Sequence, residues 1–482
     1  MLLYQRIRAR AEKGEKSILL VPEQFTSSTE GRIYRELGDA LSGMVESFSF
    51  TSLAEKILST EGGAAVQTLS DAGRAVLVRR ALEELQDNVH YYHRHRRSAA
   101  FCQMAAQTID ELKSAGLSGQ QLAQLAGACG AESGKLSELA LIFQGYETLL
   151  ARSGMDPSDR LELAGARLEE ALARHSLPEF LRDRAVFIDE FDTFNAPKKR
   201  LLGAMLAALP SVTVALCDDG APLLPGDLSL FSGAKQVAAQ LRQLARKNGA
   251  EVAVPQLLRK DLRHRNAPGL AAVAELLETG SCTADAPAGE VRLFAAPSRE
   301  EEARAAAGAI RRLMRQGVRC GKIAVVCRDI AKYRAAVRYE FRMAEIPLYC
   351  DEPTTPEFSA PATAVRALLE IARGADLTEN LTTLAKTGLC ALSEEQVCAL
   401  ENYAYTWAPT AAAWREKFER SPKGFGEQEL TEEDLRNRER AEHARALLVG
   451  AVDAFRAKVR GVNAEAISRA VYFCLKTLGA EE

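Results

Sequence analysis

The feature that most restricts the fold of this chain is a set of short apolar runs. In the first 220 residues they form two groups, and a long stretch without such runs separates the groups. The first group is Ser17–Val21 and Met44–Phe50, and the second is Arg184–Ile188 and Val212–Cys217. Each run has the length of a strand, and helical periodicity fills the sequence between neighbouring runs. Because strands that alternate with helices favour a parallel sheet, we predict an α/β fold.

The stretch between the two groups reads as helices only. From about Ser70 to His175 no convincing strand occurs. Apolar residues recur there at spacings of three and four, which is typical of helices that bury one face. The recurrence is clearest at Leu139, Ile142, Phe143, Tyr146, Leu149 and Leu150. We therefore predict that a helical insertion divides the first α/β domain.

The α/β pattern returns after a linker rich in Pro, Ala and Gly at 284–289. Three more strands are expected at Val291–Ala295, Lys322–Arg328 and Ile346–Tyr349, and only helices beyond Ser359. The predicted domains are a discontinuous first α/β domain (1–65 and 180–283), a helical insertion (66–179), a second α/β domain (290–358) and a second helical insertion (359–482).

Composition excludes several classes of protein. Lys and Arg number 62 and Asp and Glu 65, so the net charge of −3 excludes a uniformly basic nucleic-acid binder but permits a local basic groove. No apolar run approaches the roughly 20 residues of a membrane helix, and the N-terminus lacks the apolar core of a signal peptide. We expect a cytoplasmic protein that makes no membrane contact.

The ten cysteines include no C-x-x-C pair, so we expect no metal site.

A basic segment interleaved with aromatic residues spans His90–Arg97. It has no adjacent acidic or cysteine partner for a metal, and its composition suits contact with phosphates. Arg94, Arg96 and Arg97 are therefore candidate DNA-binding residues. The alternative is a solvated start of a helix.

An acidic pair follows a buried strand at Val186–Glu190, which is the Walker-B pattern of nucleotide hydrolases. In a complete site Asp189 would hold Mg²⁺ through water, and Glu190 would orient or deprotonate the attacking water. The phosphate cradle that such a site needs, G-x-x-x-x-G-K-[ST], does not occur in the sequence. Many buried strands also end in acidic loop residues, so a purely structural role stays open.

The segments together resemble the B subunit of AddAB (RexAB) ATP-dependent helicase–nucleases, which have the fold of UvrD-like superfamily-1 helicases. The resemblance runs in order along nearly the whole chain. It rests on Ile18–Thr26, Glu46–Ala54, Ile109–Leu117, Val186–Phe194, Glu290–Glu302, Lys322–Arg328 and Ile346–Tyr349.

The resemblance implies RecA-like, P-loop NTPase-like parallel sheets with large all-helical insertions. It also implies a heterodimer with an A-type helicase–nuclease subunit; the heterodimer binds single- and double-stranded DNA and processes double-strand ends for recombinational repair. In that family the helicase-like domains of the B subunit are largely inactive as a motor and scan single-stranded DNA for a hotspot sequence. ATP with Mg²⁺, and an iron–sulfur cluster in a C-terminal nuclease domain, are implied only for the full-length protein.

Two departures from the family pattern bear on activity. The P-loop is missing, and no nuclease motif or cluster cysteines precede Glu482. We therefore expect an amino-proximal fragment that binds no cofactor and is inactive alone as a helicase or nuclease. If a central strand is missing, a gap or an uncovered strand edge should remain.

By the resemblance, Asp189 and Glu190 fall on motif II, where we expect vestigial residues rather than working catalysts. Arg265 lies where such helicases carry an arginine near the γ-phosphate, and Arg328 ends a strand that could face the inter-domain cleft. An exposed basic turn and a salt bridge are the respective alternatives. The remaining DNA-binding candidates are Gln24 and Phe25 at the end of a strand, and Lys198, Lys199 and Arg200 just beyond motif II. A phenylalanine packed in the core and a solvated basic run are the respective alternatives.

Two other functions stay open at this point. One is an autonomous Mg²⁺-dependent NTPase with an unorthodox phosphate cradle, in which Glu190 would be essential. The other is a non-catalytic scaffold, whose helical regions dock an A-type helicase subunit.

Overall fold

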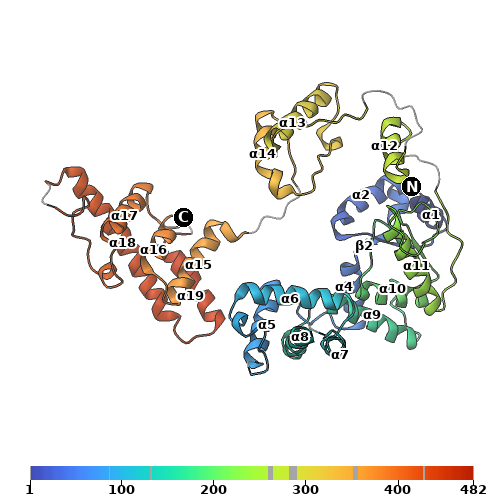
Figure 1. The fold of residues 1–482 in the computed structure, drawn as a ribbon, viewed down its shortest axis with the longest axis horizontal. Helices are drawn as coiled ribbons and strands as arrows, with labels where there is room; N and C mark the ends of the chain where they lie inside the picture. Colours follow the sequence, from blue (N-terminus) through green and yellow to red (C-terminus); the bar gives the residue numbers. More distant parts are fainter. Residues whose placement is uncertain are drawn as a thin grey trace. The chain divides into compact units, whose positions relative to one another are not determined.

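The computed structural model describes residues 2–85, 87–130, 133–258, 264–281, 290–350, 356–426 and 429–480. The chain divides into two compact units, Met1–Arg292 and Leu293–Glu482 (Figure 1). The linker predicted at 284–289 lies outside the described residues. In the described part, no helix combines the length and the apolar composition needed to cross a bilayer.

A parallel sheet of four strands forms the centre of the first unit. Its strands are β1 (Ser17–Leu20), β2 (Val45–Phe48), β3 (Ala185–Ile188) and β4 (Ser211–Val214), in the order β2-β1-β3-β4. All three neighbouring pairs are parallel. The α/β fold class predicted from the sequence is confirmed. β1 pairs with β3, with Ser17 opposite Ala185. The helical insertion lies between β2 and β3 in the sequence, so these paired strands are far apart along the chain.

Side chains alternate between the two faces of β1, as the pleat of a strand requires. Ile18 and Leu20 pack into a core with α4 (Phe50–Glu61), α9 (Pro157–Ala173) and α10 (Ala196–Ala208). Leu19 and Val21 pack on the other face, in the core that contains residues of α1 (Leu2–Ala11) and α2 (Thr26–Leu37). Both central strands are fully buried, which explains their continuous apolar sequence.

The outer strand β4 is only partly buried. In the described part of the sheet it forms one edge and β2 forms the other. Every open sheet has two edge strands, so the expectation of a missing central strand stays a prediction. The first unit also contains α3 (Asp39–Ser42), α11 (Ser232–Lys247) and α12 (Pro268–Thr279).

The helical insertion consists of α5 (Asp71–Glu84), α6 (Ala99–Ser114), α7 (Gly119–Ala126) and α8 (Ser133–Ser153), and it leads into α9. Within the described residues of 66–179 the only extended pairing is an isolated bridge between Thr68 and Met155. The helices share a core that includes Val78, Ile109 and Phe143. The helical character expected from the amphipathic periodicity is seen in these described residues, and the short helix α7 was not expected from it.

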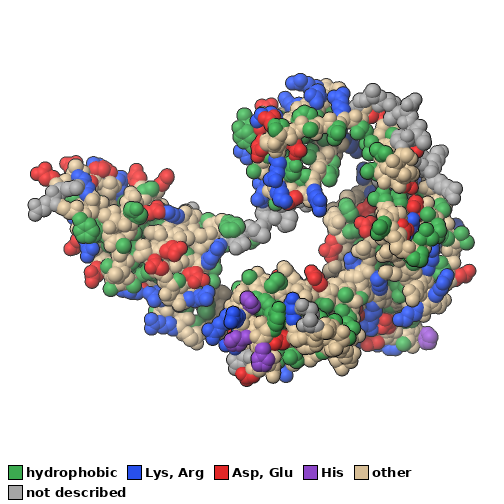
Figure 2. Space-filling model, viewed as in Figure 1, with side chains coloured by type: hydrophobic (Ala, Val, Ile, Leu, Met, Phe, Trp, Pro, Cys, Tyr) green, Lys and Arg blue, Asp and Glu red, His purple; other side chains and the backbone are tan. Residues whose placement is uncertain are grey.

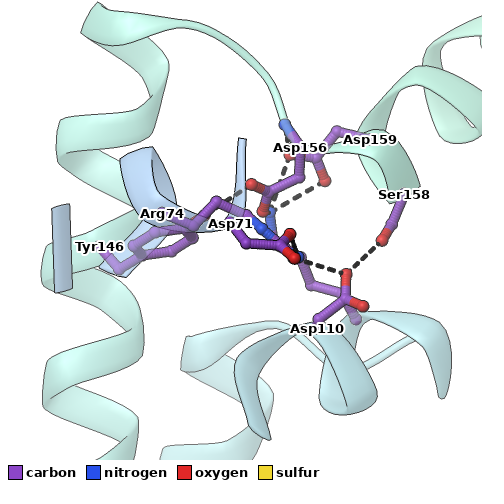
Figure 3. A network of polar contacts seen from close by, with 8 residues as sticks. Asp71, Arg74, Asp110, Tyr146, Asp156, Ser158 and Asp159 are labelled. Atoms are coloured by element: carbon purple, nitrogen blue, oxygen red, sulfur yellow. Dashed lines mark hydrogen bonds and ion pairs between the residues drawn. The ribbon is translucent and has the colours of Figure 1, made fainter. Parts of the chain in front are cut away.

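A polar network joins the insertion to the start of α9 (Figure 3). The Tyr146 hydroxyl donates to Asp156 Oδ1 at 2.5 Å, and Lys113 Nζ lies 2.7 Å from Asp156 Oδ2 and 2.8 Å from Asp159 Oδ2. Arg74 bridges Asp71 and Asp110, and Ser158 donates to Asp110. Because Asp156 is 1% exposed, its charge needs these partners.

The second unit is helical in its described part. Helices α13 (Arg299–Arg315) and α14 (Ile330–Met343) pack together. A separate core includes Trp414, Leu448 and Phe455. It joins the helices α15 (Ala360–Ala372), α16 (Leu377–Ala385), α17 (Glu394–Trp407), α18 (Glu432–Lys458) and α19 (Ala464–Thr477).

The three strands predicted at Val291–Ala295, Lys322–Arg328 and Ile346–Tyr349 are not formed in the described residues. These segments pair with no neighbour there, and Leu293, Val326 and Tyr349 are almost fully exposed. Only Ile323 and Ile346 reach the core of α13 and α14. The strand predictions were wrong. An apolar run indicates only that its side chains favour burial, whereas a strand also needs a neighbouring strand for its backbone hydrogen bonds.

Candidate nucleic-acid interface

The carboxyl ends of the central strands lie side by side at one edge of the sheet. The Asp189 N–H donates to the Leu20 carbonyl at 3.1 Å, and the Val21 N–H donates to the Phe48 carbonyl at 3.0 Å. These bonds continue the ladder by one residue beyond the strands. They place the short 3-10 helix η1 (Glu23–Phe25) and the acidic pair at the edge where open parallel sheets bind ligands.

The acidic pair makes its contacts within the first unit. Glu190 has a φ of 65°, and its N–H donates to Asp189 Oδ1 at 3.1 Å. Arg32 Nη1 lies 3.9 Å from Glu190 Oε1, and the Arg32 guanidinium lies 4.5 Å from the centroid of the Tyr4 ring. Burial raises the pKa of Tyr4; Arg32 opposes this shift, and the charges of Asp189 and Glu190 add to it.

A guanidinium approaches the acidic pair. Arg32 lies 3.9 Å from Glu190, and both side chains are more than a third exposed. In the described part of the chain no group of three or more His, Cys, Asp or Glu side chains is arranged for a metal. The G-x-x-x-x-G-K-[ST] cradle does not occur in the sequence.

An aromatic cluster lies next to the acidic pair. The rings of Phe50, Phe191 and Phe194 pack with centroid distances of 5.2 to 6.0 Å. Phe50 starts α4 after its Ser49 cap, and the two other rings belong to the loop between β3 and α10. The cluster therefore links the ends of β2 and β3.

Lys198 is held by this cluster. Its Nζ lies 5.6 Å from the Phe50 centroid and 5.4 Å from the Phe191 centroid. Burial lowers the pKa of Lys198, and the charge of Glu23 partly offsets that shift. Among the described residues no carboxylate lies within ion-pair distance of Lys198. The ammonium is thus partly desolvated and is stabilised by ring faces rather than by a salt bridge.

The next two basic residues differ from Lys198. Lys199 is half-buried. Arg200 donates to Glu162 at 3.0 Å and to Glu169 at 2.9 Å, and these bonds raise its pKa. The Arg200 guanidinium is therefore paired with two carboxylates of α9, whereas the Lys198 ammonium is in contact with aromatic rings.

Gln24 and Phe25 are exposed on η1, and 37% of the Phe25 side chain is accessible. A partly exposed aromatic ring can stack on a base, and a nearby ammonium can contact a backbone phosphate. The sheet edge thus combines an aromatic ring, which can stack on a base, with an ammonium group, which can contact a phosphate.

The other predicted residues lie on other elements of the chain. Arg265 is exposed in the turn before α12. Arg328 is exposed in the second unit, after the extended segment that follows the 3-10 helix η4 (Cys320–Lys322). Arg94, Arg96 and Arg97 lie between α5 and α6 on the helical insertion.

Sequence reasoning missed Tyr4, Arg32 and the three phenylalanines of the cluster. The repeated Phe in Glu190–Phe194 is a signal that could have found two of the rings. Tyr4 and Arg32 carry no local signal, because their contact with the acidic pair depends on how α1 and α2 pack on the sheet.

Comparison with known proteins gives a consistent result. Residues 1–274 match the family model described as "ADDB, N-terminal". The chain is 32% identical over 421 residues to the B subunit of the ATP-dependent helicase/deoxyribonuclease of Desulforudis audaxviator, covering 84% of this chain and 35% of that protein. It is 30% identical over 498 residues to the protein of the same name from Heliobacterium modesticaldum, covering 98% of this chain and 40% of that protein. The chain thus spans well under half the length of these relatives.

Proposed function

The chain belongs to the AddB family, through its N-terminal family domain, and we propose that it is the helicase-like, DNA-binding portion of the B subunit of a heterodimeric helicase–nuclease. Such an enzyme would process DNA double-strand ends for recombinational repair. The observation that carries the proposal is the position of Lys198, held over Phe50 and Phe191 at the carboxyl edge of the sheet.

Single-stranded DNA is the ligand that this edge fits. Exposed Phe25 offers a ring face to a base, and stacking of this kind contributes about 1–3 kcal/mol per base. Lys198, which has no ion-pair partner among the described residues, offers its charge to the adjoining phosphate. Gln24 offers an amide that can donate and accept. Release of counterions from the phosphates would make the binding sensitive to salt.

We propose further that this portion is inactive as a motor. The Arg32 guanidinium 3.9 Å from Glu190 supports this, because a positive charge there disfavours a metal ion beside the same carboxylate. The missing cradle sequence supports it independently. The acidic pair would then shape the edge of the sheet rather than catalyse hydrolysis.

An A-type helicase–nuclease subunit is the partner that we propose, since the relatives are named as B subunits. Gel filtration of this chain mixed with such a subunit, with and without DNA, tests the pairing. Co-elution in the absence of DNA would favour direct docking through protein surfaces.

The DNA-binding proposal is tested by fluorescence anisotropy with labelled oligo-dT over a series of salt concentrations. Lys198→Ala is expected to weaken binding and to reduce the slope of log K against log salt by about 0.7, the value for one phosphate contact on a single strand. Arg200→Ala is the matched control, because it removes an equal charge whose partners are Glu162 and Glu169.

A salt-independent interaction with oligo-dT, or none, would overturn the proposal. Equal effects of the two substitutions would show that overall charge, and not the sheet edge, governs binding.

A further inference from the structure

The helical insertion carries a second basic surface, which the sheet edge does not explain. We call residues 90–97 the basic loop; it contains three histidines, three arginines and two tyrosines, and no acidic residue. Figure 2 shows histidine side chains gathered beside α5, with Lys and Arg side chains near them. The loop joins α5 to α6 and includes the 3-10 helix η2 (His93–His95).

A single carboxylate holds the start of this loop. Glu138 on α8 accepts the backbone N–H groups of His90 at 2.8 Å, Tyr91 at 2.7 Å and Tyr92 at 3.1 Å. Burial opposes ionisation of Glu138, but the three donors outweigh it, so the pKa of this carboxyl lies below its ordinary value. Glu138 is therefore charged at neutral pH, and its carboxylate accepts hydrogen bonds from the backbone of the loop.

Apolar contacts with the core of the helical insertion also hold the loop. Val89 is buried in the core of the insertion, and the Tyr92 ring lies 5.2 Å from the Phe101 ring. The His95 ring lies 5.8 Å from the Phe101 ring. The loop thus has a defined backbone, which lowers the entropy lost when a ligand binds.

The arginines of the loop are not matched by acids in the part of the chain that the structure describes. Arg94 and Arg97 are exposed and Arg96 is half-buried. None of the three forms an ion pair with a described residue. Arg79 and Arg80 on the neighbouring helix α5, in contrast, pair with Glu83 and Glu84.

The two tyrosines of the loop contact neighbouring side chains. The ammonium of Lys135 lies 5.9 Å from the centroid of the Tyr91 ring, and the Tyr92 ring meets the Tyr91 ring edge-on at 5.0 Å. The arginines are the charged groups that the loop presents, and phosphates are the groups that these cations fit.

We propose that the basic loop binds the phosphate backbone of duplex DNA, and that Glu138 is the positioning residue that shapes it. Duplex DNA suits an unpaired set of cations because it carries one phosphate charge per roughly 1.7 Å of helix axis. The inference rests on the proposed function, since it adds a duplex contact to a chain already proposed to bind a single strand.

The first test uses the full chain with a labelled blunt 20-base-pair duplex and with oligo-dT. The double variant Arg94→Ala/Arg97→Ala is expected to weaken duplex binding and to reduce the salt slope by about two, at about 0.9 per contact. Its matched control is Arg79→Ala/Arg80→Ala, which removes two cations of the same helical insertion that are paired internally. The control should leave the slope unchanged.

The second test separates positioning from charge. Glu138→Gln removes no cation, yet it should weaken duplex binding and speed hydrogen exchange at the amides of residues 90–92. Glu147→Gln is its control, because Glu147 lies on the same helix and accepts the N–H of Gly119, outside the basic loop. Faster exchange with unchanged duplex binding would remove Glu138 from the binding role.

The outcomes distinguish this inference from the proposed function. If Arg94→Ala/Arg97→Ala behaves like its control on the duplex, the basic loop is not a duplex site, even if Lys198→Ala still weakens oligo-dT binding. Unchanged duplex binding together with lost co-elution of the A-type partner would assign the loop to an acidic protein surface and overturn the proposal.

Discussion

At the scale of single residues, neighbouring positions with the same charge have different capacities to bind a ligand. Lys198 and Arg200 are two residues apart, but Lys198 faces aromatic rings and Arg200 faces two carboxylates. The sequence run Lys198–Arg200 indicated only a basic surface. Which of its charges remains available depends on α9, which supplies Glu162 and Glu169 from a distant part of the chain.

Tyr146 should contribute measurably to stability through its hydroxyl. The group is buried and donates to the charged Asp156 at 2.5 Å. Tyr146→Phe is expected to lower the free energy of unfolding by about 1.5–3 kcal/mol, the range for a hydrogen bond to a charged partner. Urea unfolding followed by circular dichroism measures this.

Tyr91→Phe is the control, because Tyr91 is 60% exposed. A loss for Tyr146→Phe no larger than that of the control would mean that Lys113 alone satisfies Asp156.

At the scale of elements, the start of α18 gives a pH-dependent prediction. Asp434 accepts from Lys423 at 2.8 Å and from the backbone N–H of Thr431 at 2.7 Å, and the Thr431 hydroxyl also donates to it. These contacts lower the pKa of Asp434 to about 2, from an ordinary value of 3.8. A carboxyl whose pKa is lowered on folding stabilises the protein above its unfolded pKa, and that stability is lost as the pH falls toward the folded pKa.

Asp434→Asn should therefore lower the thermal midpoint at pH 5, and the difference from the unmodified chain should shrink between about pH 4 and pH 2. Glu432→Gln is the control, since it removes a charge from the same first turn but leaves the capping box of Thr431 and Asp434 intact. A difference for Asp434→Asn that does not change with pH would exclude its carboxyl as the titrating group.

Elements were predictable where the pattern of apolar residues was sufficient to define them. Helices of the insertion bury one face, so their periodicity indicated that the region is helical. Strand β3 and the segment at Lys322–Arg328 have similar apolar sequences, yet only β3 pairs with neighbours in the described residues. The difference is the presence of partner strands, which no local window of sequence contains.

At the scale of the whole molecule, the chain should not turn over nucleotide. We expect no Mg²⁺-dependent release of phosphate from ATP above background, and the same result for Glu190→Gln, because the sequence contains no G-x-x-x-x-G-K-[ST] cradle to hold the phosphates. Phosphate release measured with and without oligo-dT provides the test. Turnover that Glu190→Gln abolishes would favour the alternative of an autonomous NTPase.

The parallel α/β class and the family could be predicted from the linear chain, because apolar periodicity and ordered motifs are local properties of the sequence. Which candidate residues meet is set by tertiary packing. It placed Lys198 on aromatic rings, neutralised Arg200 and set Arg32 against Glu190. It also fixed the basic loop through Glu138, 46 to 48 residues away in sequence. Such contacts depend on how distant elements pack, so the free energy of a charge is set by neighbours that the local sequence does not contain.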